Sequence, residues 1–145
     1  DGKSVASGSP VRLFNDLFVF EPDLRNGVFV AAGDVNGDGF ADLVAGAGPG
    51  GGPRVLTLTG KDLMQNRQTA LADFFAGEPN DRNGVRVAVK ALDTDPQADI
   101  LTGAGAGAGG RVIAYAGKAL SPVGTPPEMD RIELFDGFQG DVFVG

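Results

Sequence analysis

One short stretch of the sequence concentrates oxygen-bearing side chains at a spacing that suits a metal ion. Within residues 34–42, the first, third, fifth and ninth positions carry acidic or amide side chains, namely Asp34, Asn36, Asp38 and Asp42. A tight loop turns alternate side chains inward, so these oxygens can converge with the main-chain carbonyl of Phe40 on a hard cation that takes six to eight oxygen ligands. The loop, called the first loop below, therefore predicts a calcium site.

The same residues also have a purely structural interpretation. Asn-Gly and Asp-Gly dipeptides are common in hairpin turns that hold no metal. Four oxygen donors at the required spacing within nine residues favour calcium over a bare turn. The loop is not an EF-hand, because Ala45 stands where that motif has its bidentate Glu and because strand-like segments flank it. We therefore expect a redox-inert calcium ion that pins a hairpin.

The first loop belongs to a sequence repeat. A constant shift of 57 positions carries residues 25–28 (RNGV) onto 82–85, residues 46–48 (GAG) onto 103–105, and Gly60-Lys61 onto Gly117-Lys118. Partial matches at both ends divide the chain into a tail and linker at 1–13, a first full unit at 14–66, a second full unit at 67–124, and the start of a further unit at 125–145.

The second unit carries an altered copy of the loop, residues 91–99, called the second loop below. Its ligand positions are occupied by Ala91, Asp93, Asp95 and Asp99. The first ligand is therefore lost, although three carboxylates remain. Pro96 stands in place of a glycine and cannot adopt a positive φ, so the loop must be reshaped. We expect the second loop to bind metal weakly or not at all.

The repeat unit is expected to consist of four short strands. In the first unit they fall at about 14–20, 27–33, 42–46 and 53–59, each bounded by clusters of Gly, Pro, Asn or Asp. A repeat of this length with four strands is typical of a β-propeller, whose blades bury their faces only against neighbouring blades. We therefore predict an all-β fold of four-stranded antiparallel blades, forming a fragment of a larger propeller. Further blades would come from the parent chain or from neighbouring chains that close a ring.

Composition excludes several functional classes. A net charge of −7 argues against binding to nucleic acid or to an anionic membrane surface, which both need clustered Lys and Arg. No apolar run is long enough to span a bilayer. The sequence has no His and no Cys, which removes the commonest general base and the thiolate nucleophile. The chain is therefore expected not to be an enzyme.

Two further motifs favour structural interpretations. The glycine-rich segment 46–51 satisfies a dinucleotide-binding fingerprint, but a strand-like segment follows it instead of a helix that could hold a pyrophosphate. Arg54 and Arg111 occupy the same repeat position, which favours a structural role, such as pairing with an Asp of the blade, over recognition of a ligand carboxylate.

The segment 28–46, VFVAAGDVNGDGFADLVAG, resembles an FG-GAP repeat of the VCBS type, and the resemblance extends over nearly the whole chain. It implies blades like those of integrin α-subunit heads and of many bacterial surface or secreted proteins, in rings of about seven. It also implies an extracellular or cell-surface location, where millimolar calcium would fill the loop. The metal positions of the family fall on Asp34, Asn36, Asp38, the carbonyl of Phe40, and Asp42. The second unit departs from the pattern at Ala91 and Pro96.

These observations together predict a calcium-stabilised, non-catalytic propeller module that binds a protein or glycan ligand, for example in cell adhesion. Two alternatives remain open. One is a lectin-like propeller that binds glycans between its blades. The other is the non-catalytic part of a propeller hydrolase or lyase whose catalytic residues lie outside this segment.

Overall fold

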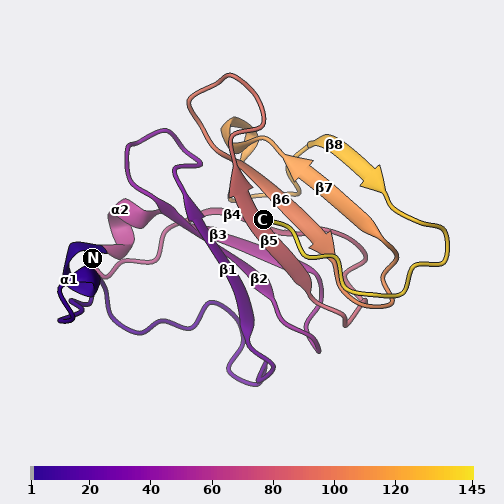
Figure 1. The fold of residues 1–145 in the computed structure, drawn as a ribbon, viewed down its shortest axis with the longest axis horizontal. Coiled ribbons are helices and arrows are strands. Elements are labelled where there is room, and N and C mark those ends of the chain that lie inside the picture. Colours follow the sequence, from indigo (N-terminus) through magenta and orange to yellow (C-terminus); the bar gives the residue numbers. More distant parts are fainter. Residues whose placement is uncertain (1) are drawn as a thin grey trace.

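A computed structural model describes residues 2–145 and shows two four-stranded antiparallel sheets (Figure 1). The first sheet contains, in spatial order, β1 (Val28–Gly33), β2 (Asp42–Ala47), β3 (Arg54–Leu58) and β4 (Ala70–Phe75). The second sheet contains β5 (Val85–Lys90), β6 (Asp99–Ala104), β7 (Arg111–Tyr115) and β8 (Glu128–Glu133). The helical segments are short: α1 (Gly2–Ala6), α2 (Gly60–Leu63) and the 3₁₀ turn η1 (Gly117–Ala119). The predicted all-β class and the four-stranded antiparallel sheets are confirmed.

The two sheets repeat the same strand register. Val28 pairs with Ala47 in the first sheet, and the residues 57 positions later, Val85 and Ala104, pair in the second. Each sheet also has an irregularity in the pairing of its third and fourth strands, at Thr57/Leu58 and at Ala114/Tyr115. The sequence repeat is therefore a structural repeat down to the position of a bulge.

The prediction of a strand at 14–20 is wrong. Residues 14–20 contain no strand, and the fourth strand of the first sheet is β4, which lies at the next repeat of that segment. The chain turns back beside β3 through α2, where the Thr59 N–H donates to the Thr69 carbonyl at 3.0 Å. A short return of this kind costs less loop entropy than pairing β3 with a distant segment. The other three expected strands form as β1, β2 and β3.

The second sheet likewise takes its fourth strand from the segment after the second sequence unit. The segment 125–145 was expected to start a further unit, but β8 within it completes the second sheet. The hydrogen-bonded sheets thus run from residue 28 to 75 and from 85 to 133. The division at 14–66 and 67–124 describes the sequence repeat and stays a prediction for the domain boundaries.

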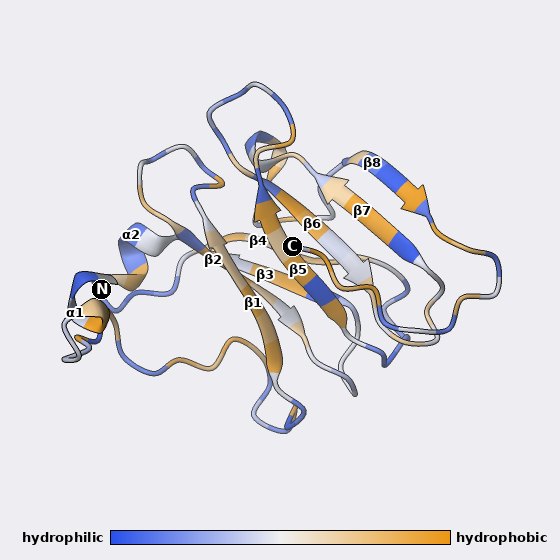
Figure 2. Ribbon diagram, viewed as in Figure 1, coloured by the Kyte–Doolittle hydropathy of each residue, from blue (hydrophilic) through white to orange (hydrophobic). Residues whose placement is uncertain are grey.

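Apolar side chains between the two sheets form the main core. Figure 2 shows that the facing strands β1 and β5 consist largely of hydrophobic residues. The first sheet contributes Val44, Val55 and Phe74, and the second contributes Ile100 and Tyr115, among others. The rings of Phe74 and Tyr115 pack edge to face, with centroids 4.8 Å apart. Each of these side chains is at most 3% exposed, so the sheet-to-sheet contact supplies most of the hydrophobic stabilisation.

A glycine sets the separation of the two sheets. A Cβ at Gly46 in β2 would overlap the carbonyl oxygen of Val85 in β5, so only glycine permits this approach. Gly103 makes the equivalent approach to the carbonyl of Val142. The C-terminal residues therefore pack on the second sheet as β5 packs on the first (Figure 1).

A second contact repeats in the same way. The Gly50 N–H donates to the Arg82 carbonyl at 2.7 Å, and the Gly107 N–H donates to the Gln139 carbonyl at 2.9 Å. The contact that joins the first sheet to the second thus occurs a second time in the chain. In this second case the C-terminal residues pack against the second sheet. No helix within residues 2–145 has the length and apolar character needed to cross a membrane.

Candidate metal centre

The first loop joins β1 to β2, and its turn is organised by Asp34. One carboxylate oxygen of Asp34 accepts hydrogen bonds from the N–H groups of Gly37, at 2.7 Å, and Asp38, at 3.1 Å. The other oxygen accepts from the Gly39 N–H at 2.8 Å. Gly37 and Gly39 have φ values of 78° and 83°, which residues with a side chain rarely adopt. The glycines thus fold the backbone around the Asp34 carboxylate.

Asn36 and Asp38 continue this pattern of side chains that accept from the backbone. The Asn36 Oδ1 accepts from the Asp38 N–H at 2.9 Å, and the Asp38 Oδ1 accepts from the Phe40 N–H at 3.0 Å. Asp38 and Phe40 are exposed, whereas Asn36 is half-buried. The Asp38 carboxylate can therefore turn without disturbing the core.

Asp42 anchors the loop to the rest of the sheet. It is only 1% exposed. Its Oδ2 accepts from the Val35 N–H at 3.1 Å, and its Oδ1 accepts from the Gly60 N–H at 2.9 Å. The side chain thus connects the start of the loop, the start of β2 and the start of α2.

The electrostatic environment of Asp42 favours a nearby cation. Burial raises the pKa of Asp42 because it disfavours the charged carboxylate, and the charges of Asp38 and Asp34 raise the pKa further. The hydrogen bonds from Gly60 and Val35 oppose this shift. A bound cation would relieve both the desolvation and the repulsion between like charges.

The donor set of the first loop fits calcium by chemistry. Three carboxylates, one amide oxygen and one main-chain carbonyl are all hard oxygen donors. A carboxylate has about four lone-pair positions, so oxygens that already accept from backbone N–H groups keep capacity for a cation. Within the described part of the chain, no three or more acidic side chains already converge in the geometry of a metal site. The assignment of Asp34, Asn36, Asp38, Phe40 and Asp42 as ligands therefore stays a prediction.

The second loop keeps much of the same backbone arrangement. The N–H of Asp95 donates to Asp93 Oδ1 at 2.9 Å, and the N–H of Gln97 donates to Asp95 Oδ1 at 3.1 Å. Asp99 is fully buried and accepts from Leu92 at 2.8 Å and from Gly117 at 3.1 Å. The reshaping expected from Pro96 therefore leaves these bonds intact, and the missing part is the set of bonds that Asp34 makes in the first loop.

The two loops lie side by side at one end of the sheets (Figure 1). The Asp34 carbonyl accepts a hydrogen bond from the Ala98 N–H of the second loop at 2.8 Å. A Cβ built on Gly37 would lie 2.9 Å from the side-chain nitrogen of Gln97. The candidate metal loop is therefore part of the junction between the two sheets.

Arg54 has the structural role that its repeat position predicts. Its Nε and one terminal nitrogen each lie 2.8 Å from an oxygen of Asp73 in the neighbouring strand β4. Its other terminal nitrogen lies 2.6 Å from Glu21. Hydrogen bonds from Arg54 hold the pKa of Asp73 below its usual value. Two carboxylates therefore already engage this guanidinium.

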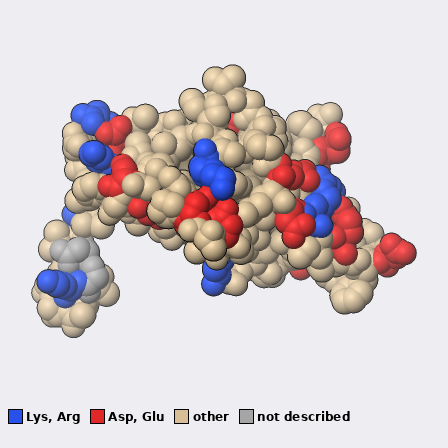
Figure 3. Space-filling view, turned by 90° about the horizontal axis from the view of Figure 1, so that it is seen from above, with Lys and Arg blue, Asp and Glu red and all other residues tan. Residues whose placement is uncertain are grey.

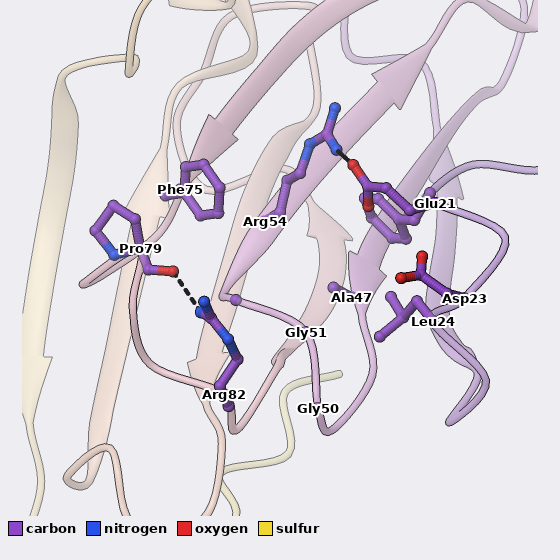
Figure 4. Close-up of a pocket in the computed structure, with 12 residues that line it drawn as sticks. Glu21, Asp23, Leu24, Ala47, Gly50, Gly51, Arg54, Phe75, Pro79 and Arg82 are labelled. Carbon is purple, nitrogen blue, oxygen red and sulfur yellow. Dashed lines mark hydrogen bonds and ion pairs between the residues drawn. The ribbon is translucent and has the colours of Figure 1, made fainter.

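A cavity of about 390 Å³ that no sequence motif indicated lies beside the glycine-rich segment (Figure 4). Gly50, Gly51 and Gly52 form one wall, and Glu21, Asp23, Arg54 and Arg82 bring both signs of charge to it. The Arg82 guanidinium donates to the Pro79 carbonyl at 2.7 Å. The glycine-rich segment leads into β3 and not into a helix, as predicted. The only sequence signal for the cavity was this run of glycines.

Surface charge is mixed over the face of the molecule that Figure 3 shows. Acidic groups lie among Lys and Arg side chains on this face, and no continuous basic stripe crosses it. This pattern agrees with the net charge of −7. It offers no electrostatic track for a nucleic-acid backbone on that face.

The fold and the acidic hairpin loop define an all-β repeat protein built from four-stranded antiparallel sheets. Residues 26–60 match the family model of the FG-GAP repeat. The match contains β1, the first loop, β2 and β3, and it confirms the family resemblance over a shorter range than the whole chain. Neither a curated protein nor a solved structure matched the chain.

Proposed function

We propose that the chain is a calcium-stabilised, non-catalytic section of a β-propeller that acts outside the cell in adhesion or ligand binding. The FG-GAP repeat supports this proposal, because such repeats suggest an integrin-like propeller module and are typical of extracellular proteins. The observation that carries the calcium assignment is the donor set of the first loop, which lies inside the matched repeat. The lack of His and Cys agrees with a non-catalytic role.

Calcium bound by the first loop would act as a structural staple. It would draw the carboxylates of Asp34, Asp38 and Asp42 onto one ion, neutralise them, and so hold the hairpin between β1 and β2 closed. Because the Asp34 carbonyl also accepts from the Ala98 N–H, a rigid first loop would stabilise the junction with the second sheet. The ion supplies charge and coordination, and no chemical step depends on it.

The expected gain can be estimated from linkage. With a dissociation constant near ~10⁻⁴ M, typical of extracellular modules, calcium at ten times that concentration adds about 1.4 kcal/mol. For a chain of this length the gain raises the unfolding temperature by about 3–6 °C. Differential scanning calorimetry with 1 mM CaCl₂ and with EDTA measures this shift directly.

The test uses Asp38→Ala, because Asp38 is exposed and its replacement leaves the buried anchor Asp42 in place. We expect this variant to lose both the calcium-dependent shift and the heat of calcium titration. Asp136→Ala, which removes an exposed carboxylate outside both loops, should respond to calcium like the unsubstituted protein. Equal and negligible heats in the unsubstituted protein and in Asp38→Ala would remove the calcium assignment.

The cavity beside Gly50–Gly52 supports a second candidate function, which is lectin-like glycan binding. Its volume of about 390 Å³ and its mixed charge suit a small polar ligand such as a sugar unit. A glycan-array screen of the whole chain tests this alternative. Glycan binding that survives Asp34→Ala but is lost in Arg82→Ala would support the lectin reading over calcium-bridged adhesion.

A further inference from the structure

A lysine ammonium from η1 pairs with two carboxylates of the second loop. The ammonium of Lys118 lies 2.7 Å from Asp95 Oδ2 and 3.2 Å from Asp93 Oδ2. Asp93 and Asp95 occupy the repeat positions of Asn36 and Asp38, two of the predicted calcium ligands of the first loop. A single positive group is therefore bound by two side chains at ligand positions.

The equivalent lysine of the first unit behaves differently. Lys61 stands 57 positions before Lys118, and its ammonium lies over the ring of Phe40, 5.9 Å from the ring centroid. Among the ion pairs of residues 2–145, none joins Lys61 to a carboxylate of the first loop. The second loop has Gln97 in place of Phe40. The aromatic ring thus offers Lys61 an alternative contact that Lys118 lacks.

The two loops have the same need for positive charge. Each contains three carboxylates, which are Asp34, Asp38 and Asp42 in the first loop and Asp93, Asp95 and Asp99 in the second. The charges of Asp34 and Asp38 act unfavourably on Asp42, and Asp93 and Asp95 lie close enough to contact one ammonium. Like charges in such positions repel one another unless a cation compensates them. The backbone bonds to Asp42 and Asp99 are equivalent, whereas among the ion pairs of residues 2–145 a lysine joins carboxylates of the second loop alone.

We infer that the Lys118 ammonium is the resident cation of the second loop and takes the role that a divalent ion would have there. It neutralises Asp93 and Asp95 and ties them to η1, whose first residue, Gly117, donates to the third carboxylate, Asp99, at 3.1 Å. The hairpin between β5 and β6 is therefore held closed without calcium. This inference does not depend on whether the first loop binds calcium.

The test compares thermal unfolding in EDTA and in 10 mM CaCl₂, with Asp38→Ala as the background so that the first loop does not respond. With Lys118 present, this background should unfold at the same temperature in both buffers. Adding Lys118→Met should lower the unfolding temperature in EDTA by about 1–4 °C, the range for a partly exposed ion pair. Calcium should recover most of that loss, because three carboxylates are then left without a cation.

Two further variants serve as controls in the same background. Lys118→Arg keeps a positive charge within reach of Asp93 and Asp95 and should behave like Lys118. Lys61→Met removes the repeat-matched lysine and should produce no loss that calcium recovers. If the first loop does not bind calcium, Asp38→Ala leaves the response of the unfolding temperature to calcium unchanged. The Lys118 variants can then still be compared with this background.

Three results would overturn the inference. One is an unchanged unfolding temperature of Lys118→Met in EDTA. Another is a loss in Lys118→Met that calcium does not recover, since the ammonium would then be an ordinary surface ion pair. The third is a calcium-dependent rise in the Asp38→Ala background with Lys118 in place, because the second loop would then bind metal despite the lysine.

Discussion

Replacing Asp42 by Asn tests the claim that this carboxylate anchors the first hairpin even without calcium. The two oxygens of Asp42 accept from the N–H groups of Val35 and Gly60, at 3.1 and 2.9 Å, and the side chain is 1% exposed. An amide has a single acceptor oxygen, so Asp42→Asn must point its NH₂ group at one of these two donors. One buried N–H is then left without an acceptor.

The cost of this change follows from the geometry. An unsatisfied buried donor costs about 1–3 kcal/mol, and removal of the buried charge returns part of that cost. A net loss of about 2 kcal/mol lowers the unfolding temperature by about 4–8 °C. The loss should be present in EDTA, because it comes from the backbone bonds and not from a bound ion.

The assay combines calorimetry in EDTA with amide hydrogen exchange. We expect the amide of Val35 or of Gly60 to exchange faster in Asp42→Asn, and Asp99→Asn to have the same effect in the second sheet. Asp38→Asn is the matched control, because its exposed side chain should change the stability in EDTA by no more than about 0.5 kcal/mol. If Asp42→Asn is as stable as Asp38→Asn in EDTA, with both amides protected as before, the anchoring argument is refuted.

Two further predictions concern the sheets themselves. Asp73→Asn should lower the free energy of unfolding by about 1–2 kcal/mol at neutral pH, because it breaks the paired bonds from Arg54. Hydrogen bonds from Arg54 lower the pKa of Asp73 in the folded protein. The stabilisation by this pair is therefore complete above the unfolded pKa of about 3.9 and is lost as the pH falls through the folded pKa. Urea denaturation at pH 7 and at pH 2.5 measures the change, and an equal difference at both pH values would contradict it. Gly46→Ala should cost about 1–3 kcal/mol by pushing Val85 and its sheet away. Gly103→Ala, which meets only the C-terminal residues, should cost less in the same denaturation assay, and equal losses would argue against the packing described.

The sequence repeat predicted that the sheets exist, but it did not predict which strands belong to the same sheet. A shift of 57 positions shows that two segments are equivalent, and it gives no information on which of them pairs with β3. That choice depends on the return of the chain through α2 and on the contact between Thr59 and Thr69. Residues 14–20 have strand-like composition, yet Phe20 packs with Ala45 and Ala47 on the outer face of the first sheet instead.

The candidate site was predictable in its residue types and less so in its contacts. The spacing of Asp34, Asn36, Asp38 and Asp42 placed all four around one turn, because these contacts are local. The bond from Gly60 to Asp42 spans 18 residues, and the ion pair from Lys118 to Asp93 spans 25. Neither spacing belongs to a motif, so only the folded chain brings these groups together.

On the proposed assignments, the contact between the two loops gives the difference in their cations a physical reason. Both loops lie at one junction, joined by the bond from the Ala98 N–H to the Asp34 carbonyl, so a charge in one loop is near the other loop. Two divalent ions placed side by side would repel each other more strongly than a divalent ion and an ammonium. Two sequence differences agree with the proposed assignments. Gln97 stands in place of Phe40, so Lys118 lacks the ring contact of Lys61 and pairs with Asp93 and Asp95. Ala91 stands in place of Asp34, so the first loop alone keeps the full set of predicted calcium ligands.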